Sequence, residues 1–291
     1  MRIDYLLLNE SVRGSQISEI EISEKLTEFF IICDEIIQYE DENIFYSLEV
    51  YNQVFNGSDF VSWLYSSDEE TTEKQLLRLY LEKELILNEE LYENLYNSGN
   101  SDDVGGIILL EKPLKFNKHI TPIDSSDSCL HIRKQILMKS SNAEDFVKGI
   151  SKTFPNLFLS RNVFKSIKHF NPITKHADEL IKHLSALNDY AMECYSIYKQ
   201  RGHKAALQVF KAKSKGLECS PEGDAKRVTK FLSFEFVDVD GEVRKVECSP
   251  HTKLYQTNSD DRIYFEWNDE RVNGRPPILI GHIGDHPYDK K

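Results

Sequence analysis

The sequence has no long apolar run and no closely spaced cysteine pair. Its longest apolar tracts are of the kind found at Phe29–Cys33, far short of the roughly 20 residues that cross a bilayer. The first ten residues lack the basic segment and apolar core of a secretory signal. The five cysteines are odd in number and make no CxxC pair, which disfavours a zinc ribbon or a thioredoxin-like site. These absences predict a soluble, cytoplasmic protein with reduced thiols and no membrane partner.

Sequence motifs of several enzyme classes are also missing. There is no GxxxxGK[ST] loop, no strand-linked GxGxxG and no GxSxG elbow. Asp238–Gly241 resembles the start of a calcium loop, but no glutamate closes it at the twelfth position. His282 and His286 imitate a helical HxxDH metal motif, although the neighbouring glycines and proline disfavour a helix there. We therefore expect no metal and no cofactor.

Charge is distributed unevenly along the chain. The 291 residues contain 48 acids and 36 bases, a net charge of -12. Residues 1–111 contain 25 acids and 6 bases, whereas residues 112–225 contain 11 acids and 19 bases. Phosphate contacts need a local excess of Lys and Arg, so the later segment is compatible with a nucleic-acid partner that the average charge would exclude. Two solvated surfaces of opposite sign explain the same split, and the sequence leaves this choice open.

Helical periodicity dominates the first 225 residues, with apolar side chains recurring at three- and four-residue spacing. The expected helices cover residues 17–37, 73–87, 154–170, 177–197 and 204–215, with an interruption at Gly202. Residues 97–103 and 124–128 are polar and turn-rich, and residues 107–110 are typical of a short strand. We predict an acidic, mainly helical domain over 1–111, a linker over 112–129 and a second domain over 130–291.

The hydrophobic period changes from 3.6 to 2 after about residue 226. Apolar and polar residues alternate over 232–237, and Asp240-Gly241 is a strong hairpin signal. Further strands are expected at 252–256, 262–267 and 277–283. The predicted fold class is α+β, with basic helices packed on a four- to five-stranded antiparallel sheet.

Four segments follow one another in this predicted sheet: Lys253-Leu254-Tyr255, Arg262–Trp267, Ile278–His282 and Asp285–Tyr288. Their order resembles the C-terminal half of the RelE/ParE family of toxins, ribosome-dependent mRNA interferases and their relatives. The resemblance covers about residues 160–291 and is sharpest over 253–288. It implies basic helices ahead of the sheet, and it has no counterpart for the first 150 residues.

The resemblance also implies roles for individual residues. Lys253 and Arg262 stand where the family places bases that contact phosphate and stabilise charge. Tyr288 stands in the position of the C-terminal tyrosine that stacks on the RNA or activates it.

One departure affects the expected chemistry. The arginine that follows Gly-His in the family is Ile283 here, so cleavage would depend on His251, His282 or His286. RNA carries its own nucleophile, and a metal-independent ribonuclease needs only a base, an acid and a cation. Histidine serves as either acid or base near neutral pH. In the alternative interpretation, the same Arg and His side chains lie on an exposed face of a small sheet and have no catalytic role.

Two hypotheses of different classes therefore stand. In the first, the chain is a toxin-like RNA-cleaving or nucleic-acid-binding effector, with RNA or the ribosome as partner, and its acidic domain restrains it. Growth arrest or antiphage defence would be the biological setting. In the second, the chain is a non-enzymatic interaction subunit of a larger complex, and residues 1–111 bind a basic protein. The aromatic-rich segment 45–65 suits a protein interface.

Overall fold

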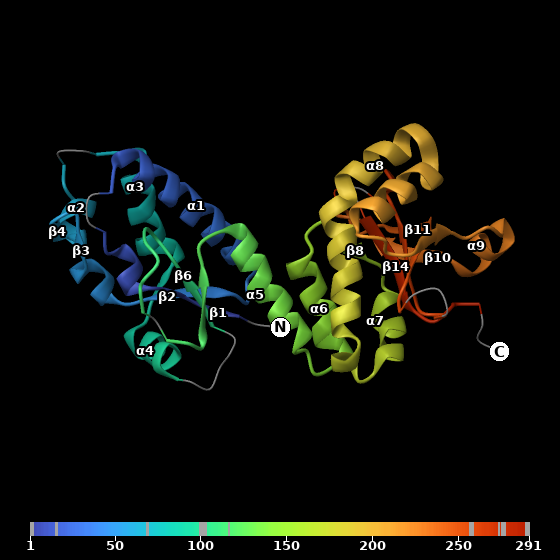
Figure 1. Cartoon of the computed structure of the whole chain (residues 1–291), viewed down its shortest axis with the longest axis horizontal. Coiled ribbons are helices and arrows are strands. Elements are labelled where there is room, and N and C mark those ends of the chain that lie inside the picture. The colour runs from blue at the N-terminus through green and yellow to red at the C-terminus, as the bar shows by residue number, and fades with distance from the viewer. Residues whose placement is uncertain are drawn as a thin grey trace. The chain divides into compact units, whose positions relative to one another are not determined.

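The computed structural model describes residues 3–14, 17–67, 70–98, 104–115, 117–255, 259–272, 274 and 278–288. The chain divides into two compact units, residues 2–133 and 134–291 (Figure 1). Helix α5, Ser126–Met138, runs through the boundary. None of the helices in the described ranges is both long and apolar enough to cross a membrane.

The first unit is built on a parallel five-stranded sheet with the order β5-β2-β1-β6-β7. Its strands are β1 Asp4–Leu7, β2 Asn43–Tyr46, β5 Ile86–Leu87, β6 Val104–Ile107 and β7 Ile120–Ile123. Tyr5, Leu6 and Leu7 are all fully buried, although successive side chains of a strand point to opposite faces. Both faces of this sheet are therefore covered, as is usual for parallel sheets.

Helices supply that cover. The elements are α1 Glu19–Ile37, α2 Phe60–Leu64, α3 Thr72–Leu79, α4 Glu89–Asn97, the 3-10 turns Asn9–Val12 and Leu48–Asn52, the π-helical turn Tyr80–Glu84, and the hairpin β3 Val54–Phe55 with β4 Ser58–Asp59. Helix α1 begins at a capping box formed by Ser18 and Glu21. Helices α1 and α4 lie on opposite sides of the sheet (Figure 1), and Tyr92 of α4 joins the core cluster that contains Leu6 and Phe45.

A buried ion pair attaches α5 to this unit. Arg133 Nη2 lies 2.9 Å from Glu42 Oε2, and the two side chains are almost completely enclosed. The same guanidinium donates to the Glu35 carbonyl at 2.9 Å and lies over the Tyr39 ring. Breaking a buried pair by removing one partner leaves an uncompensated charge, so this contact fixes the helix firmly.

Helices do supply most of the regular structure of the first domain, as predicted, but the parallel sheet at its centre was not expected. Its strands have two to four residues and are apolar on both faces, so they show no two-residue period that sequence analysis could detect. The strand expected at 107–110 is β6, which ends at Ile107. Residues 112–129, expected as a linker, contain β7 and the start of α5. The helix expected over 73–87 ends at Glu84, and Ile86–Leu87 form β5.

The second unit contains a five-stranded sheet with the order β8-β14-β13-β12-β9. Its strands are β8 Leu157–Leu159, β9 Cys219–Pro221, β12 Pro250–Lys253, β13 Arg262–Glu266 and β14 Ile278–Gly284. Strand β8 pairs parallel with β14, and the other neighbours are antiparallel. A separate two-stranded hairpin consists of β10 Ser233–Val237 and β11 Val243–Glu247.

One face of this sheet packs on helices. The helical elements are α6 Ala143–Thr153, α7 Val163–Ser166, α8 Ala177–Lys213, α9 Ala225–Phe231, and the 3-10 turns Ile167–Phe170 and Ile173–Lys175. Leu180 and Leu184 of α8 share a core with Ile263 and Ile280. The interruption expected at Gly202 is confirmed by its non-helical backbone, with φ 77°.

The hairpin packs on the opposite face at Gly281. A register shift on β14 leaves Gly281 unpaired between Ile280 and His282, which is a β-bulge. A Cβ atom on Gly281 would lie 2.7 Å from Cys248 Sγ and 2.8 Å from a ring carbon of Phe234. Glycine is therefore required where the hairpin approaches the strand.

The mixed helix-and-sheet composition of the prediction is confirmed, and the details of the second sheet are corrected. The hairpin at Asp240-Gly241 exists, with Gly241 at φ 83°, but it forms its own sheet. The segment 154–170, expected as helix, contains β8. This strand lies at a sheet edge and has only three residues, too few to show a period.

Replacing Gly281 with alanine should destabilise the second unit by about 1–3 kcal/mol, because the added methyl overpacks the contact with Phe234. Denaturant unfolding followed by Trp267 fluorescence in a Trp63→Phe background measures this. Gly223→Ala is the matched control, since a methyl group added there would have nothing within 4 Å. Adding Phe234→Leu should recover part of the loss, and an additive double variant would contradict the proposed contact.

Candidate functional site

The sheet of the second unit brings the residues singled out from the sequence onto one face. Lys253 pairs directly with Arg262 across β12 and β13, and His251 pairs with Tyr264. Tyr264 in turn pairs with His282 of β14. Residues directly opposite one another, or two apart on one strand, share a face. The bulge at Gly281 is what turns His282 to this face while Ile280 and Ile283 both enter the helical core.

A connected group of polar and aromatic side chains, here called the histidine–tyrosine cluster, lies on this face. Its members are Ser220, Glu222, His251, Tyr264, His286 and Tyr288. Ser220 Oγ lies 3.1 Å from His251 Nε2, and the His251 and Tyr264 ring centroids are 4.9 Å apart. The Tyr264 hydroxyl lies 2.6 Å from His286 Nδ1.

The cluster continues from His286 to the C-terminal tyrosine. The His286 and Tyr288 ring centroids are 4.7 Å apart, and the Tyr288 hydroxyl donates to Glu222 at 2.8 Å. The guanidinium of Arg227 lies 5.0 Å from the centre of the Tyr288 ring, a cation–π contact. Tyr288 is therefore held against α9 and β9, and its hydroxyl is already engaged.

Burial sets the protonation states within the cluster. It lowers the pKa of His251 to about 4, and the nearby positive charge of Arg262 acts in the same direction. Burial likewise raises the pKa of Tyr264. Although burial opposes it, the hydrogen bonds from Tyr288 and from backbone amides hold the pKa of Glu222 below its ordinary value. At neutral pH the cluster therefore contains a neutral His251, a protonated Tyr264 and an ionised Glu222.

Three of the six residues singled out from the sequence are enclosed. The exposed fractions are 5 % for His251, 6 % for Arg262 and 3 % for His282, whereas Lys253, His286 and Tyr288 are half-buried. The Arg262 guanidinium donates to the backbone carbonyls of Ser259 and Asp261.

The hydrogen bonds of His282 define its tautomer. Nε2 lies 2.7 Å from the Asp285 carbonyl, which only accepts, so Nε2 carries the proton. Nδ1 then accepts from the Asn162 amide at 3.0 Å, and the same amide lies 3.4 Å from the Gly281 carbonyl. Both ring nitrogens are engaged, so in this arrangement His282 positions Asn162 and offers no free base.

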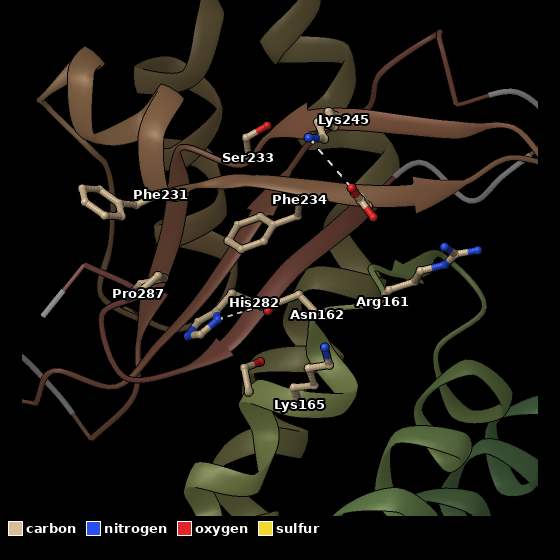
Figure 2. Close-up of a pocket in the computed structure, with 11 residues that line it drawn as sticks. Arg161, Asn162, Lys165, Phe231, Ser233, Phe234, Lys245, His282 and Pro287 are labelled. Atoms are coloured by element: carbon tan, nitrogen blue, oxygen red, sulfur yellow. Dashed lines mark hydrogen bonds and ion pairs between the residues drawn. The ribbon is translucent and has the colours of Figure 1, made fainter. Parts of the chain in front are cut away.

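A pocket of about 730 Å³ opens beside His282 (Figure 2). We call it the basic pocket. Its lining contains three cationic, three polar, two aromatic and three further side chains: Arg161, Lys165, Lys245, Asn162, Ser166, Ser233, Phe231, Phe234, Glu235, His282 and Pro287. Figure 2 shows Lys165 and Lys245 on opposite sides of the pocket, with Phe234 between them.

Backbone contacts hold the segment before α7 at the edge of the pocket. Ser160 donates from its amide to the Ile280 carbonyl at 2.9 Å and from its hydroxyl to the Gly281 carbonyl at 2.6 Å. The next amide, that of Arg161, donates to the Glu235 carbonyl of β10 at 3.2 Å. Arg161 and Asn162 are thereby fixed between β14 and the hairpin.

The pocket carries an excess of positive charge. Arg161 and Lys165 are exposed, and neither forms an ion pair with any residue that the structure describes. Lys245 is 3.9 Å from Glu235, and its side chain is 70 % exposed, so this pair is weak. Three cations against one carboxylate favour an anionic ligand.

The three pocket cations and Asn162 were not among the residues singled out from the sequence. Arg161 and Lys165 stand four residues apart in a segment already recognised as basic, which was the one available signal. The sequence contained no signal for Lys245 or Asn162. Lys245 reaches the pocket only because the hairpin packs over Gly281, and Asn162 is positioned there by its hydrogen bond to His282.

The described part of the chain has no group of three His, Cys, Asp or Glu side chains placed to hold a metal ion. No protein-family model matches the sequence, and comparisons with curated proteins and with solved structures give no match. The resemblance to the RelE/ParE family and the roles it implies stay predictions.

The shifted pKa of His251 predicts a pH dependence of stability. Its folded value of about 4 lies below the ordinary value of about 6.5, so between these values the unfolded chain binds more protons. The contribution is therefore fully present above about pH 6.5 and lost as the pH falls towards 4. His251→Gln should flatten the dependence of unfolding free energy on pH by about 1.4 kcal/mol per pH unit in this window. An unchanged slope in denaturant titrations would show that His251 is not buried as a neutral ring.

Proposed function

We propose that the second unit binds RNA through the basic pocket. The observation that carries the proposal is that three exposed cations and two aromatic side chains line one pocket. Arg and Lys supply the phosphate contacts that dominate nucleic-acid affinity. Phe231 and Phe234 give the apolar surface on which an unpaired base packs.

The form of the pocket favours a single strand over a duplex. A volume of about 730 Å³ suits a nucleotide that enters as a separate unit, whereas duplexes are contacted along their grooves. Asn162, held by His282, adds a side-chain amide of fixed orientation at the same place. Such a group reads base edges or the ribose hydroxyl.

Cleavage of the bound RNA, which the family resemblance implies, is the stronger form of this proposal. For His282 it requires the exchange of a present hydrogen bond for one to substrate, because both ring nitrogens are engaged. His251 and His286 each have one ring nitrogen bonded to a protein hydroxyl, and His251 is also buried. If RNA stays intact on prolonged incubation with the full chain, the chain binds RNA without cleaving it. Loss of cleavage in His282→Ala with binding retained would support a toxin-like ribonuclease in growth arrest or antiphage defence.

A protein-interaction role for the first unit is the second candidate function. Residues 2–133 contain 27 acids and 10 bases, whereas residues 134–291 contain 21 acids and 26 bases. An acidic surface of this strength attracts a basic partner.

Removing single cations from the basic pocket should weaken RNA binding. For Arg161→Gln, Lys165→Gln and Lys245→Gln we expect the slope of log affinity against log salt to fall by about 0.7 each, the value for one phosphate contact to a single strand. Fluorescence anisotropy of a labelled single-stranded RNA with the full chain measures both affinity and slope.

Lys148→Gln is the matched control, since it removes the same charge from α6 of the same unit, where Lys148 pairs with Glu144. If this variant loses as much affinity as the pocket variants, general charge and not the pocket accounts for the binding.

A further inference from the structure

A second hollow lies in the first unit, between the first turns of α1 and α3. It has a volume of about 380 Å³, and we call it the α1–α3 groove. Ile20, Ile22 and Trp63 form its apolar lining. Ile20 is 74 % exposed, so a large aliphatic side chain faces solvent at this groove. Exposed apolar surface rimmed by polar residues marks interaction sites.

Carboxylates border this apolar surface. Glu19 and Glu24 lie on the α1 side and Glu73 on the α3 side. Glu73 accepts a hydrogen bond from Ser23 at 2.8 Å, which joins the two helices and holds the pKa of Glu73 below its ordinary value. Glu19 and Glu24 form no ion pair with any described residue. Helix α1 as a whole carries six acids and one base.

The one cation in the lining offsets only one of the three carboxylates, so the lining keeps a net negative charge. Lys74 is only 3 % exposed. Its ammonium donates to Ser66 Oγ at 3.2 Å and lies 4.8 Å from the centre of the Trp63 ring. The ammonium thus contacts the Trp63 ring from the protein interior. The charged groups of the groove that face solvent are carboxylates.

We propose that the α1–α3 groove is a docking site for a basic amphipathic helix of a partner protein. Charge complementarity selects this occupant: apolar side chains on one face of the helix would enter between Ile20 and Trp63, and its Lys or Arg residues would face Glu19 and Glu24. A volume of about 380 Å³ accommodates one or two large side chains, as in other helix-in-groove complexes. This inference is independent of RNA binding by the second unit.

Trp63 provides a direct readout, because the chain has only two tryptophans and Trp267 is fully buried in the other unit. The probe is an 18-residue peptide of leucine and lysine patterned with one apolar helical face. Added to the full chain carrying Trp267→Phe, it should change the Trp63 emission. Anisotropy of the labelled peptide with the unaltered chain measures the affinity independently of that substitution.

Two variants of the same helix locate the site. Ile20→Arg should lower the affinity for the peptide by about tenfold or more, as expected for the loss of a central apolar contact. Ile31→Arg is the matched control, since Ile31 is exposed on α1 outside the groove, and it should leave the affinity unchanged within about twofold.

Three results would overturn the proposal. Equal binding of a peptide with glutamate in place of lysine would remove the charge argument. Equal loss of affinity in Ile31→Arg, or binding without any Trp63 response, would place the peptide elsewhere. Self-association of the chain that Ile20→Arg abolishes would identify a second copy as the occupant.

Discussion

The close approach of the Phe234 ring to the backbone of Gly281 determines how the second unit forms its site. The absence of a side chain at Gly281 lets the hairpin settle on β14. Phe234 then reaches the floor of the basic pocket, and Lys245, on the neighbouring strand, reaches its edge. The same residue forms the bulge that turns His282 towards the hairpin.

The hydrogen bonds of His282 give it a different role from the one that the sequence suggests. As a free histidine it would be an acid or base for RNA cleavage. With its proton directed to the Asp285 carbonyl and its other nitrogen to Asn162, it fixes the orientation of a neighbouring amide. The rings of Phe234 and His282 are also stacked, with centroids 6.0 Å apart. The bulge at Gly281, the packing of the hairpin on it and the orientation of the Asn162 amide therefore depend on one another.

Some of this was predictable from the sequence and some was not. The alternation over 232–237 and the Asp240-Gly241 turn predicted the hairpin. The shared face of His251, Lys253, Arg262 and His282 depends on the strand register, which the sequence could not supply. The burial of His251 and Arg262 was not predictable, because it depends on cover from other elements. The parallel sheet of the first unit was missed because strands such as Asp4–Leu7 are buried on both faces and lack a period. Charge counting along the chain located a basic segment but could not assign Lys245, which joins Arg161 and Lys165 only in three dimensions.

The central claim is that RNA occupies the basic pocket, and lysine footprinting tests it most directly. The full chain is acetylated briefly with and without a saturating single-stranded RNA, and the modification of each lysine is measured by mass spectrometry. We expect strong protection of Lys165 and Lys245, the two lysines of the pocket, while Lys148 and Lys182, exposed on α6 and α8, keep their reactivity. Equal protection of all four lysines, or protection of Lys148 and Lys182 alone, would contradict this claim.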